Sequence, residues 1–339
     1  MRAWHIEQCI GTEGLALREH PQPVPGPREV LIKVHASSIN FRELMAINGW
    51  AKDWVRTGVV PSPDGAGEVV AVGPGVRRNK VGDRVAVNFY EDWIAGEFPG
   101  YGDPFGRGFQ LDGLLTEYIV VGDDATVAIP KHLSYEEAAT LPCAALTAWS
   151  SLVAHAPLMP GDTVLVEGSG GVSVFALQLA KLFGTQVIAT TSDDDKAKRL
   201  RELGADAVIN YRTIPAWDVE VMKLTEGRGV DVVVDIGGAD TIARSIASAR
   251  MGGRVSLAGL LTGTPQAGLT KADAYAGRNI LLHPIRVGSR EQFEQMNRAI
   301  AWHALKPVID RVFGFEQLPD AVRHLQSQKH IGKIVIRHA

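Results

Sequence analysis

The chain has 339 residues and a mass of 36.5 kDa, a length that favours two domains over a single core. Hydrophobic residues make up 45% and charged residues 22% of the sequence, a balance typical of a soluble globular protein and not of a disordered or fibrous chain. The 35 basic and 38 acidic side chains give a net charge of -3, so we expect neither nucleic acid nor an anionic membrane as a partner.

The cysteine content and the apolar segments bear on the cellular compartment. Two cysteines, Cys9 and Cys143, are too few for a disulfide scaffold or for a zinc site built mainly from thiolates, and they fit a reducing compartment. The first residues contain no long apolar segment of the secretory type, and no apolar stretch approaches the roughly 18 residues of a membrane span. We therefore expect a cytoplasmic protein.

The first part of the chain, residues 1–127, consists of short apolar segments separated by Gly-Pro turns. Segments with a period of two, such as Val30–His35 and Glu68–Val72, predict an antiparallel, barrel-like β domain. A helix is expected to begin at Ser134, because Glu137 follows three residues later as in a capping box. Pro142 is expected to kink or divide that helix.

From there, apolar β-branched segments alternate with amphipathic helical ones, which predicts a doubly wound parallel sheet covered on both faces. The expected strands are Thr163–Glu167, Gln186–Thr190, Ala207–Asn210, Asp231–Ile236, Arg254–Ala258 and Asn279–His283. The tail contains two expected helices, Arg290–His303 and Leu318–Ser327, and a last strand, Gly332–Arg337. We expect this tail to return to the first domain, so that residues 1–127 and 290–339 form one domain and residues 128–289 the other.

The turn after the first of these parallel strands predicts a dinucleotide site. It consists of Gly168, Ser169, Gly170, Gly171, Val172 and Ser173. Glycine lets the backbone approach a pyrophosphate, and the start of the following helix offers free N–H groups and the positive end of its dipole. Ser173 stands where the G-x-G-x-x-G pattern has its third glycine, and it is small enough for close helix–strand packing. The alternative is an ordinary tight strand–helix turn.

The end of the next strand favours NADP(H) over NAD(H). An NAD site usually has an acidic residue there, whereas this strand ends in Thr191 and Ser192 and reaches no carboxylate until Asp193. Hydroxyl groups and nearby cations suit a 2′-phosphate: Lys196 lies just downstream of this strand, and Tyr211 and Arg212 follow the third strand. Alternatively, Lys196 starts a solvated helix face and Tyr211 belongs to the core. An acidic run beginning at Asp193 would repel a phosphate if it pointed inward, but it can cap the helix instead.

Several motifs in a fixed order resemble the medium-chain dehydrogenase/reductase superfamily, specifically its zinc-free, quinone-oxidoreductase-like branch. They are PGPREVLIKVHASSINFREL, PDGAGEVVAVGPGV, VGDRVAV, LPCAALTAW, GSGGVS, LGADAVINY and GKIVIR, and they span essentially the whole chain. The resemblance implies a GroES-like catalytic domain split around a Rossmann domain. It also implies a nicotinamide cofactor in the cleft between them and a dimer or tetramer.

The resemblance also predicts that no metal is bound. Superfamily members with catalytic zinc use a Cys, a His-Glu pair and a second Cys, whereas this chain has Asn40, then Pro63 and Asp64, and matches only the last with Cys143. These residues cannot supply the three protein ligands of a catalytic zinc, and the segment 88–118 lacks the four cysteines of the structural zinc. Cys143 is expected to be a small buried residue, with a reactive thiol as the alternative.

Three residues are candidates for catalysis. The resemblance places Asn40 at the nicotinamide end of the cleft, where its amide can donate to a substrate oxygen; it can equally cap the helix that follows. Arg42 can steady a developing oxyanion or form a structural pair with Asp64. Tyr90 is a candidate proton donor at the start of the aromatic, glycine-rich loop up to Gly113, or it packs the end of the barrel.

Further cofactor contacts are expected where the parallel strands end, because ligands bind beyond their carboxyl ends. These residues are Gly237, Gly259, Leu260, Val287, Gly288 and Ser289. The resemblance places the nicotinamide carboxamide near the later ones and lets Lys333 reach the cofactor's phosphates. The alternative for Lys333 is a lysine on a strand edge that keeps the sheet soluble.

The sequence thus predicts a zinc-independent, NADPH-dependent oxidoreductase that passes hydride to a small electrophile, first a quinone and next an α,β-unsaturated carbonyl. A ketone or aldehyde reductase and an alcohol dehydrogenase are the alternatives within the superfamily. Alcohol oxidation is less favoured because deprotonating a hydroxyl without zinc requires a tuned base. A non-catalytic, crystallin-like NADPH-binding protein is the alternative of another class. We expect a homodimer, paired through the apolar edge strand at Asn279–His283.

Overall fold

The computed structural model describes residues 1–100, 106–263 and 277–338, and it divides into two compact units. Unit 1 comprises Met1–Leu146 and Gly288–Ala339, and unit 2 comprises Thr147–Val287. The expected division after residue 127 lies earlier than this one. The reason is that helix α2 (Tyr135–Ala138) contacts three strands of unit 1 and so belongs with it. Residues 101–105 of the expected aromatic loop lie outside the described residues.

Unit 1 is a mainly antiparallel β structure with four α-helices in its described residues. Its strands are β1 (Arg2–Ile6), β2 (Leu15–Glu19), β3 (Glu29–Ile39), β4 (Asp64–Val72), β5 (Arg84–Val87), β6 (Tyr118–Gly122), β7 (Thr126–Ala128), β14 (Ile309–Gly314) and β15 (Lys333–Arg337). Its α-helices are α1 (Phe41–Ile47), α2, α9 (Arg290–Trp302) and α10 (Leu318–Gln326). Short helical turns are η1 (Thr12–Gly14), η2 (Lys52–Trp54), η3 (Asp123–Ala125), η4 (Leu141–Ala145) and η6 (Phe315–Gln317).

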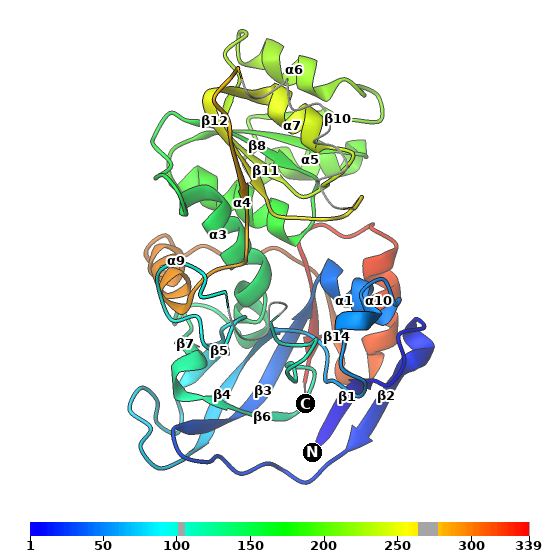
Figure 1. The fold of residues 1–339 in the computed structure, drawn as a ribbon, viewed down its shortest axis with the longest axis vertical. Coiled ribbons are helices and arrows are strands. Elements are labelled where there is room, and N and C mark those ends of the chain that lie inside the picture. Colours follow the sequence, from blue (N-terminus) through cyan, green and yellow to red (C-terminus); the bar gives the residue numbers. More distant parts are fainter. Residues whose placement is uncertain (101–105, 264–276, 339) are drawn as a thin grey trace. The chain divides into compact units, whose positions relative to one another are not determined.

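Strand β3 is the centre of the main sheet, whose order is β14-β15-β3-β4-β5-β7, with β6 also paired to β3 (Figure 1). It pairs with β4 along most of its length, with β6 through its first half and with β15 through its second half. Val30, Ile32 and Val34 pack into one hydrophobic core, at the period of two that predicted the strand, although Leu31 between them is buried as well. The expected antiparallel, barrel-like domain is confirmed.

The tail returns to unit 1, as expected, but it contributes two strands instead of one. Strand β15 pairs antiparallel with β3 and parallel with β14, with α10 as the crossover between the two tail strands. Strand β14 was not predicted because Asp310, Arg311 and Val312 are exposed, as is usual for the edge position that β14 occupies. Because β15 lies between two strands, the interpretation of Lys333 as an edge lysine is wrong.

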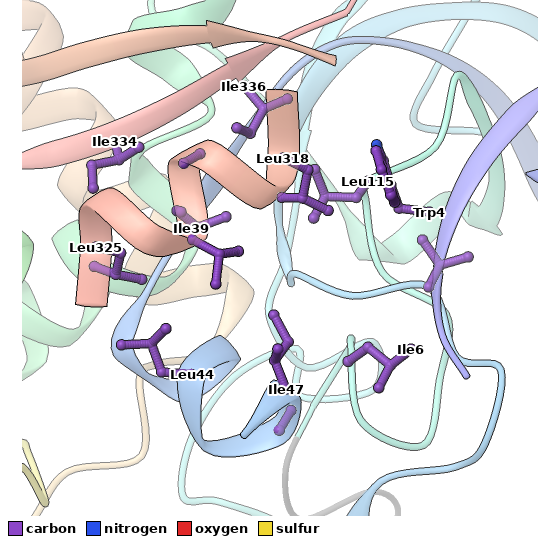
Figure 2. Packing of buried hydrophobic residues seen from close by; sticks show 14 of the residues in the cluster. Trp4, Ile6, Ile39, Leu44, Ile47, Leu115, Leu318, Leu325, Ile334 and Ile336 are labelled. Atoms are coloured by element: carbon purple, nitrogen blue, oxygen red, sulfur yellow. The ribbon is translucent and has the colours of Figure 1, made fainter. Parts of the chain in front are cut away.

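A hydrophobic core holds α1 and α10 against the sheet of unit 1, as Figure 2 shows. Leu44 and Ile47 on α1 and Leu318 and Leu325 on α10 are almost fully buried, together with Ile336 on β15. Their spacing of three and seven residues puts each pair on one face of its helix. This core fixes the start of α1 beside the start of β15, which positions the polar residues described below.

Unit 2 is a six-stranded parallel sheet of the order β10-β9-β8-β11-β12-β13, the order of the doubly wound dinucleotide fold. Its strands are β8 (Thr163–Glu167), β9 (Gln186–Thr191), β10 (Ala207–Asn210), β11 (Val230–Asp235), β12 (Ala249–Leu257) and β13 (Leu281–Pro284). Its helices are α4 (Gly171–Leu182), α5 (Asp194–Glu202), α6 (Trp217–Leu224) and α7 (Ile242–Ser248), and all but the first residue of α3 (Leu146–Val153). All six expected strands are present within a few residues of their predicted bounds.

The expected helix break at Pro142 takes the form of a wider turn. The chain leaves α2, forms the π-helical turn η4 over Leu141–Ala145, and continues as α3. Ser134 accepts a hydrogen bond from the backbone N–H of Glu137 at 3.2 Å, so the predicted capping box is confirmed. Within the described ranges, no helix is both long and apolar enough to cross a lipid bilayer.

Candidate functional site

The glycine turn of unit 2 has the geometry that a dinucleotide needs. Gly168 has a φ of +77°, which L side chains rarely adopt, and its N–H donates to the carbonyl of Thr190 at 2.9 Å. Ser173 is fully buried, and its hydroxyl donates to the carbonyl of Glu167 at 2.6 Å. Serine therefore fills the place of the third glycine and also ties helix α4 to the end of β8.

The first turn of α4 is open to an anion. Gly170 is the N-cap and has no side chain that could accept the first N–H groups of the helix. Gly170, Gly171 and Val172 are all partly exposed, while Ser169 is buried. Backbone donors at the positive end of a twelve-residue helix suit a pyrophosphate, so the described residues fit the cofactor predicted from the sequence.

Thr191, Ser192 and Tyr211, which were expected around a 2′-phosphate, lie at the adjacent ends of β9 and β10. Thr191 pairs in register with Asn210, and its carbonyl accepts the N–H of Tyr211 at 2.9 Å. Ser192 is partly exposed and the Tyr211 side chain is 41% exposed, so Tyr211 is not a core residue. Asp193 caps α5 by accepting the backbone N–H of Lys196 at 3.0 Å, which is the capping role considered for this acidic run.

The ends of β11 and β12 pack closely together. Gly237 donates its N–H towards Glu167, and a Cβ built on Gly259 would meet the carbonyl oxygen of Ile236 at 2.2 Å. Gly259 must therefore remain glycine, while the neighbouring Leu260 is 43% exposed. Val287 is the last residue of unit 2 and has a φ of +39°.

Gly288 and Ser289 open the returning segment of unit 1. The hydroxyl of Ser289 accepts the N–H of Gln292 at 3.2 Å and caps α9, and the Ser289 side chain is fully buried. That bond uses one lone pair of the hydroxyl oxygen and leaves its O–H as a hydrogen-bond donor. The contacts predicted at Val287, Gly288 and Ser289 stay predictions.

A buried polar group in unit 1, here called the Asp64 cluster, consists of Asn40, Asp64, Cys143 and Lys333. The Asp64 carboxylate is fully buried and accepts from Asn40 Nδ2 at 2.9 Å and from the backbone N–H of Cys143 at 2.8 Å. The Lys333 ammonium lies 3.2 Å from Asp64 Oδ2 and also donates to Asn40 Oδ1 and, at 3.0 Å, to the carbonyl of Ile39. A buried ion pair with every partner satisfied is the arrangement that low dielectric favours.

Three elements bring these groups together. Asn40 is the N-cap of α1, yet its amide is bonded to Asp64 and Lys333, and the helix start is capped by Glu43 Oε2 accepting the Asn40 N–H at 2.6 Å. Asp64 begins β4 and Lys333 begins β15, and both strands flank β3. Asn40 thus occupies the N-cap position considered for it, and its predicted contact with a substrate oxygen stays a prediction.

Burial raises the pKa of Cys143, within the Asp64 cluster, and of Glu43, next to it. Burial raises the pKa of Glu43 to about 7; the charge of Asp64 adds to this shift, and that of Arg42 opposes it. Burial, with the charge of Asp64, raises the pKa of the Cys143 thiol well above its usual range. The backbone N–H of Cys143 lies in the π-helical turn and points towards Asp64. Cys143 is a small buried residue, as predicted.

Arg42 and Tyr90 lie in packed surroundings. The Arg42 guanidinium lies 4.1 Å from the ring centre of Phe109 and 4.9 Å from that of Phe89, and it pairs with Glu43 at 3.3 Å. The expected structural partner of Arg42 was Asp64. Asp64 pairs with Lys333 instead, and Arg42 pairs with Glu43. Tyr90 is 8% exposed and its ring meets Phe89 edge-on at 4.7 Å, which fits the packing alternative better than proton donation.

The Asp64 cluster does not fit a catalytic zinc. Its oxygen donors, Asn40 Oδ1 and Asp64 Oδ2, already share the ammonium of Lys333, and Cys143 is the one thiol among them. A catalytic zinc takes three nitrogen, sulfur or carboxylate ligands and would displace that cation. In the part of the chain that the structure describes, no group of three or more His, Cys, Asp or Glu side chains could hold a metal ion.

Comparisons with known proteins agree with this architecture. A family model described as an alcohol dehydrogenase GroES-like domain matches residues 26–131, and one described as a zinc-binding dehydrogenase matches residues 171–302. The chain belongs to the medium-chain dehydrogenase/reductase superfamily and is an NAD(P)-dependent oxidoreductase of that class.

Individual relatives and a solved structure show which proteins this chain resembles over its length. The chain is 38% identical over 336 residues to a zinc-type alcohol dehydrogenase-like protein of Schizosaccharomyces pombe, covering 98% of this chain and 97% of that protein. It is 28% identical over 332 residues to the quinone oxidoreductase of Homo sapiens, covering 95% and 92%. The solved structure of an NAD-dependent alcohol dehydrogenase superposes with a TM-score of 0.90 at 34% identity, covering 99% of each chain.

Sequence reasoning missed two features of these sites. It named Asp64 as a replaced zinc-ligand position and as a partner of Arg42 but not as the partner of Lys333, and it overlooked Glu167, whose carboxylate accepts the N–H of Gly237 beside the glycine turn. One signal was available for Glu167, because a carboxylate ending a fully buried strand needs a partner. No local signal pointed to the pairing of Asp64 with Lys333, since they lie 269 positions apart.

Proposed function

We propose that this protein is a zinc-independent, NADPH-dependent oxidoreductase that reduces a small electrophile, with a quinone as the first substrate class and an α,β-unsaturated carbonyl as the second. The observation that carries the proposal is the buried Lys333 ammonium bonded to both Asn40 and Asp64. The Lys333 ammonium is bonded to the oxygen atoms that a metal would need as ligands. Chemistry in this cluster therefore rests on hydrogen bonding and protein charge.

NADPH is proposed over NADH because of what ends β9. Thr191 and Ser192 carry hydroxyl groups, Tyr211 is exposed beside them, and the first carboxylate, Asp193, is engaged as the cap of α5. An acidic side chain that would bind a ribose 2′-hydroxyl is missing from the end of this strand. The backbone donors of Gly170, Gly171 and Val172 would hold the pyrophosphate.

The reduced nicotinamide supplies the hydride, and the chain's own residues supply binding and polarisation. An amide nitrogen carries two N–H donors, and the bond to Asp64 uses one of them at Asn40. We assign the second to the substrate oxygen that gains negative charge during reduction. Lys333 holds the Asn40 carbonyl, which fixes the direction of the amide and places a positive charge next to it.

The test is NADPH oxidation, followed by absorbance, with a quinone, an enone and an aldehyde as separate acceptors. Parallel samples contain NADH, EDTA or added zinc. Turnover that prefers NADPH and ignores EDTA is expected, with the quinone ahead of the enone. Loss of activity on chelation would overturn the zinc-independent site. A preference for the aldehyde, or for oxidation of an alcohol, would select the alternatives within the superfamily, and tight NADPH binding without turnover would select a binding protein.

The role of Asn40 is tested with Asn40→Ala and with Asn48→Ala at the other end of α1 as the control. We expect Asn40→Ala to lower kcat by about 100-fold, the usual effect of removing one donor to a developing oxyanion, while the Kd for NADPH stays unchanged. Asn48→Ala should leave both constants as they are. An unchanged kcat in Asn40→Ala would remove Asn40 from the mechanism.

A further inference from the structure

Two buried carboxyl groups of unit 2 meet at one hydroxyl. Glu167 ends β8 and is 4% exposed, and Asp235 ends β11 and is fully buried. Ser245, on α7, is also fully buried, and its Oγ lies 2.6 Å from Glu167 Oε1 and 2.7 Å from Asp235 Oδ2. Both contacts are short enough to be hydrogen bonds between oxygen atoms.

One hydroxyl cannot satisfy two carboxylates. Ser245 carries a single O–H, so with both acids ionised one of these short contacts would set lone pairs against lone pairs in a buried site. The contacts are both satisfied if one acid keeps its proton. That acid then donates to Ser245 Oγ, and the Ser245 hydroxyl donates to the other acid. The geometry therefore requires one proton for the pair.

The remaining hydrogen bonds indicate which acid holds that proton. Burial raises the pKa of both acids, but Asp235 accepts the N–H of Gly238 at 2.9 Å and the hydroxyl of Thr241 at 2.9 Å, so its negative charge is the better stabilised of the two. Glu167 accepts only long bonds on Oε2, from the N–H groups of Ile236 at 3.3 Å and Gly237 at 3.4 Å. Burial, reinforced by the charge of Asp235, raises the pKa of Glu167, so Glu167 is the protonated partner.

The charged groups on the surrounding elements are engaged elsewhere. Lys181 on α4 pairs with Asp206, and Arg244 on α7 pairs with Asp218. On β12, Arg250 pairs with Asp231 of β11, and Arg254 donates to the carbonyls of Leu152 and Ala156. Strand β9 carries no charged residue, and Asp240 in the turn after β11 is exposed. No cation among these residues replaces the shared proton.

The pair joins the two loops that the dinucleotide requires. Glu167 immediately precedes Gly168, and its carbonyl holds Ser173 at the start of α4. Its carboxyl group reaches the N–H groups of the turn after β11, and Asp235 holds the next N–H of that turn. If the proton were lost, the carboxylates of Glu167 and Asp235 would both be negative and would repel each other at the base of both loops.

We propose that Glu167 and Asp235 share one proton through Ser245, and that this proton holds the glycine turn and the turn after β11 in the arrangement that binds the dinucleotide. Glu167 is thus a positioning residue whose protonation sets cofactor affinity. This inference rests on the proposed function only in so far as unit 2 binds NADPH. It predicts that affinity falls as the solution becomes alkaline.

The experiment measures the Kd for NADPH between pH 7 and 9.5 by quenching of protein fluorescence. Its variants are Glu167→Gln, Asp235→Asn and, as a control, Glu202→Gln, whose carboxylate is an exposed partner of Arg199 on α5. Either amide in the pair supplies the N–H that the shared proton supplies, so each of the first two variants should bind with a pH-independent Kd. The wild type and the control should weaken by about tenfold.

Thermal unfolding without cofactor separates this inference from the proposed function. The melting temperature of the wild type relative to that of Glu167→Gln should fall as the pH rises from 5 to 9, whether or not NADPH binds. Absence of NADPH binding with this trend present would defeat the proposed function and keep the shared proton. Parallel pH profiles of the wild type and both amide variants, in binding and in unfolding, would overturn the shared proton.

Discussion

Glu43 shows how one side chain at the start of α1 affects both structure and titration. Its carboxylate caps the helix through the Asn40 N–H, and it is 2% exposed next to Arg42. A buried acid of this kind is held close to its point of titration by burial on one side and by a cation and an N–H donor on the other. Small changes in its surroundings therefore alter its charge near neutral pH.

Glu43→Gln is expected to alter how stability depends on pH. The pKa of Glu43 is raised from 4.5 to about 7 in the folded protein, so the folded state holds a proton that the unfolded state has lost between those values. The stability contributed by this proton is complete below pH 4.5 and lost as the pH rises through 7. Relative to Glu43→Gln, the wild type should lose about 3 kcal/mol of unfolding free energy over this range.

Urea denaturation at pH 5, 6, 7 and 8 measures this difference, and Glu13→Gln in the exposed turn η1 serves as the control. The control should run parallel to the wild type. A constant difference between the wild type and Glu43→Gln at all four pH values would contradict the raised pKa.

At the scale of elements, helix starts carry much of the local information in this chain. Asp193 caps α5, Ser134 caps α2 and Ser289 caps α9, in each case by accepting the N–H three residues ahead. These bonds satisfy donors that a helix cannot satisfy itself. They are encoded within four consecutive residues, which is why they can be recognised without a fold.

Asp193→Ala is expected to destabilise the protein by about 1 kcal/mol, the usual effect of losing an N-cap side chain. Asp195→Asn, in the first turn of the same helix, removes a charge of the same sign without removing the cap and should lower stability by at most about 0.5 kcal/mol. Chemical denaturation of both variants at low salt makes the comparison. Equal losses would show that charge, and not the capping bond, stabilises the start of α5.

At the scale of the whole molecule, strand β13 is the last strand of the six-stranded sheet within the described residues. Leu281 on this strand is 48% exposed. An apolar edge with unpaired backbone groups invites pairing with another strand. We propose that two copies of the chain pair through β13 as a homodimer.

Leu281→Lys is the matching test, with Met159→Lys, an exposed apolar residue before β8, as the control. Sedimentation or light scattering over a dilution series should give a dimer for the wild type and the control. The dimer dissociation constant should rise by at least about tenfold in Leu281→Lys, because a strand-edge lysine disfavours edge pairing. A monomeric wild type, or a Leu281→Lys dimer as tight as the wild type, would disprove pairing through this edge.

The sequence by itself determined the architecture of unit 2. All six parallel strands, the glycine turn and the return of the tail were predicted, because each depends on neighbouring residues: buried β-branched runs, a turn glycine and a helix cap. Strand β14 escaped prediction because its exposed, charged residues resemble a loop until the partner strand β15 is in place.

Only the tertiary structure decided the chemistry. Asn40, Asp64, Cys143 and Lys333 come from four separate segments, and nothing local to any of them indicates that one ammonium joins two of the others. Ser245 likewise meets Glu167 across 78 positions of the chain. The physical reason is that charge and proton sharing depend on burial and on atomic distance, and both are set by how the strands pack and not by the order of the residues.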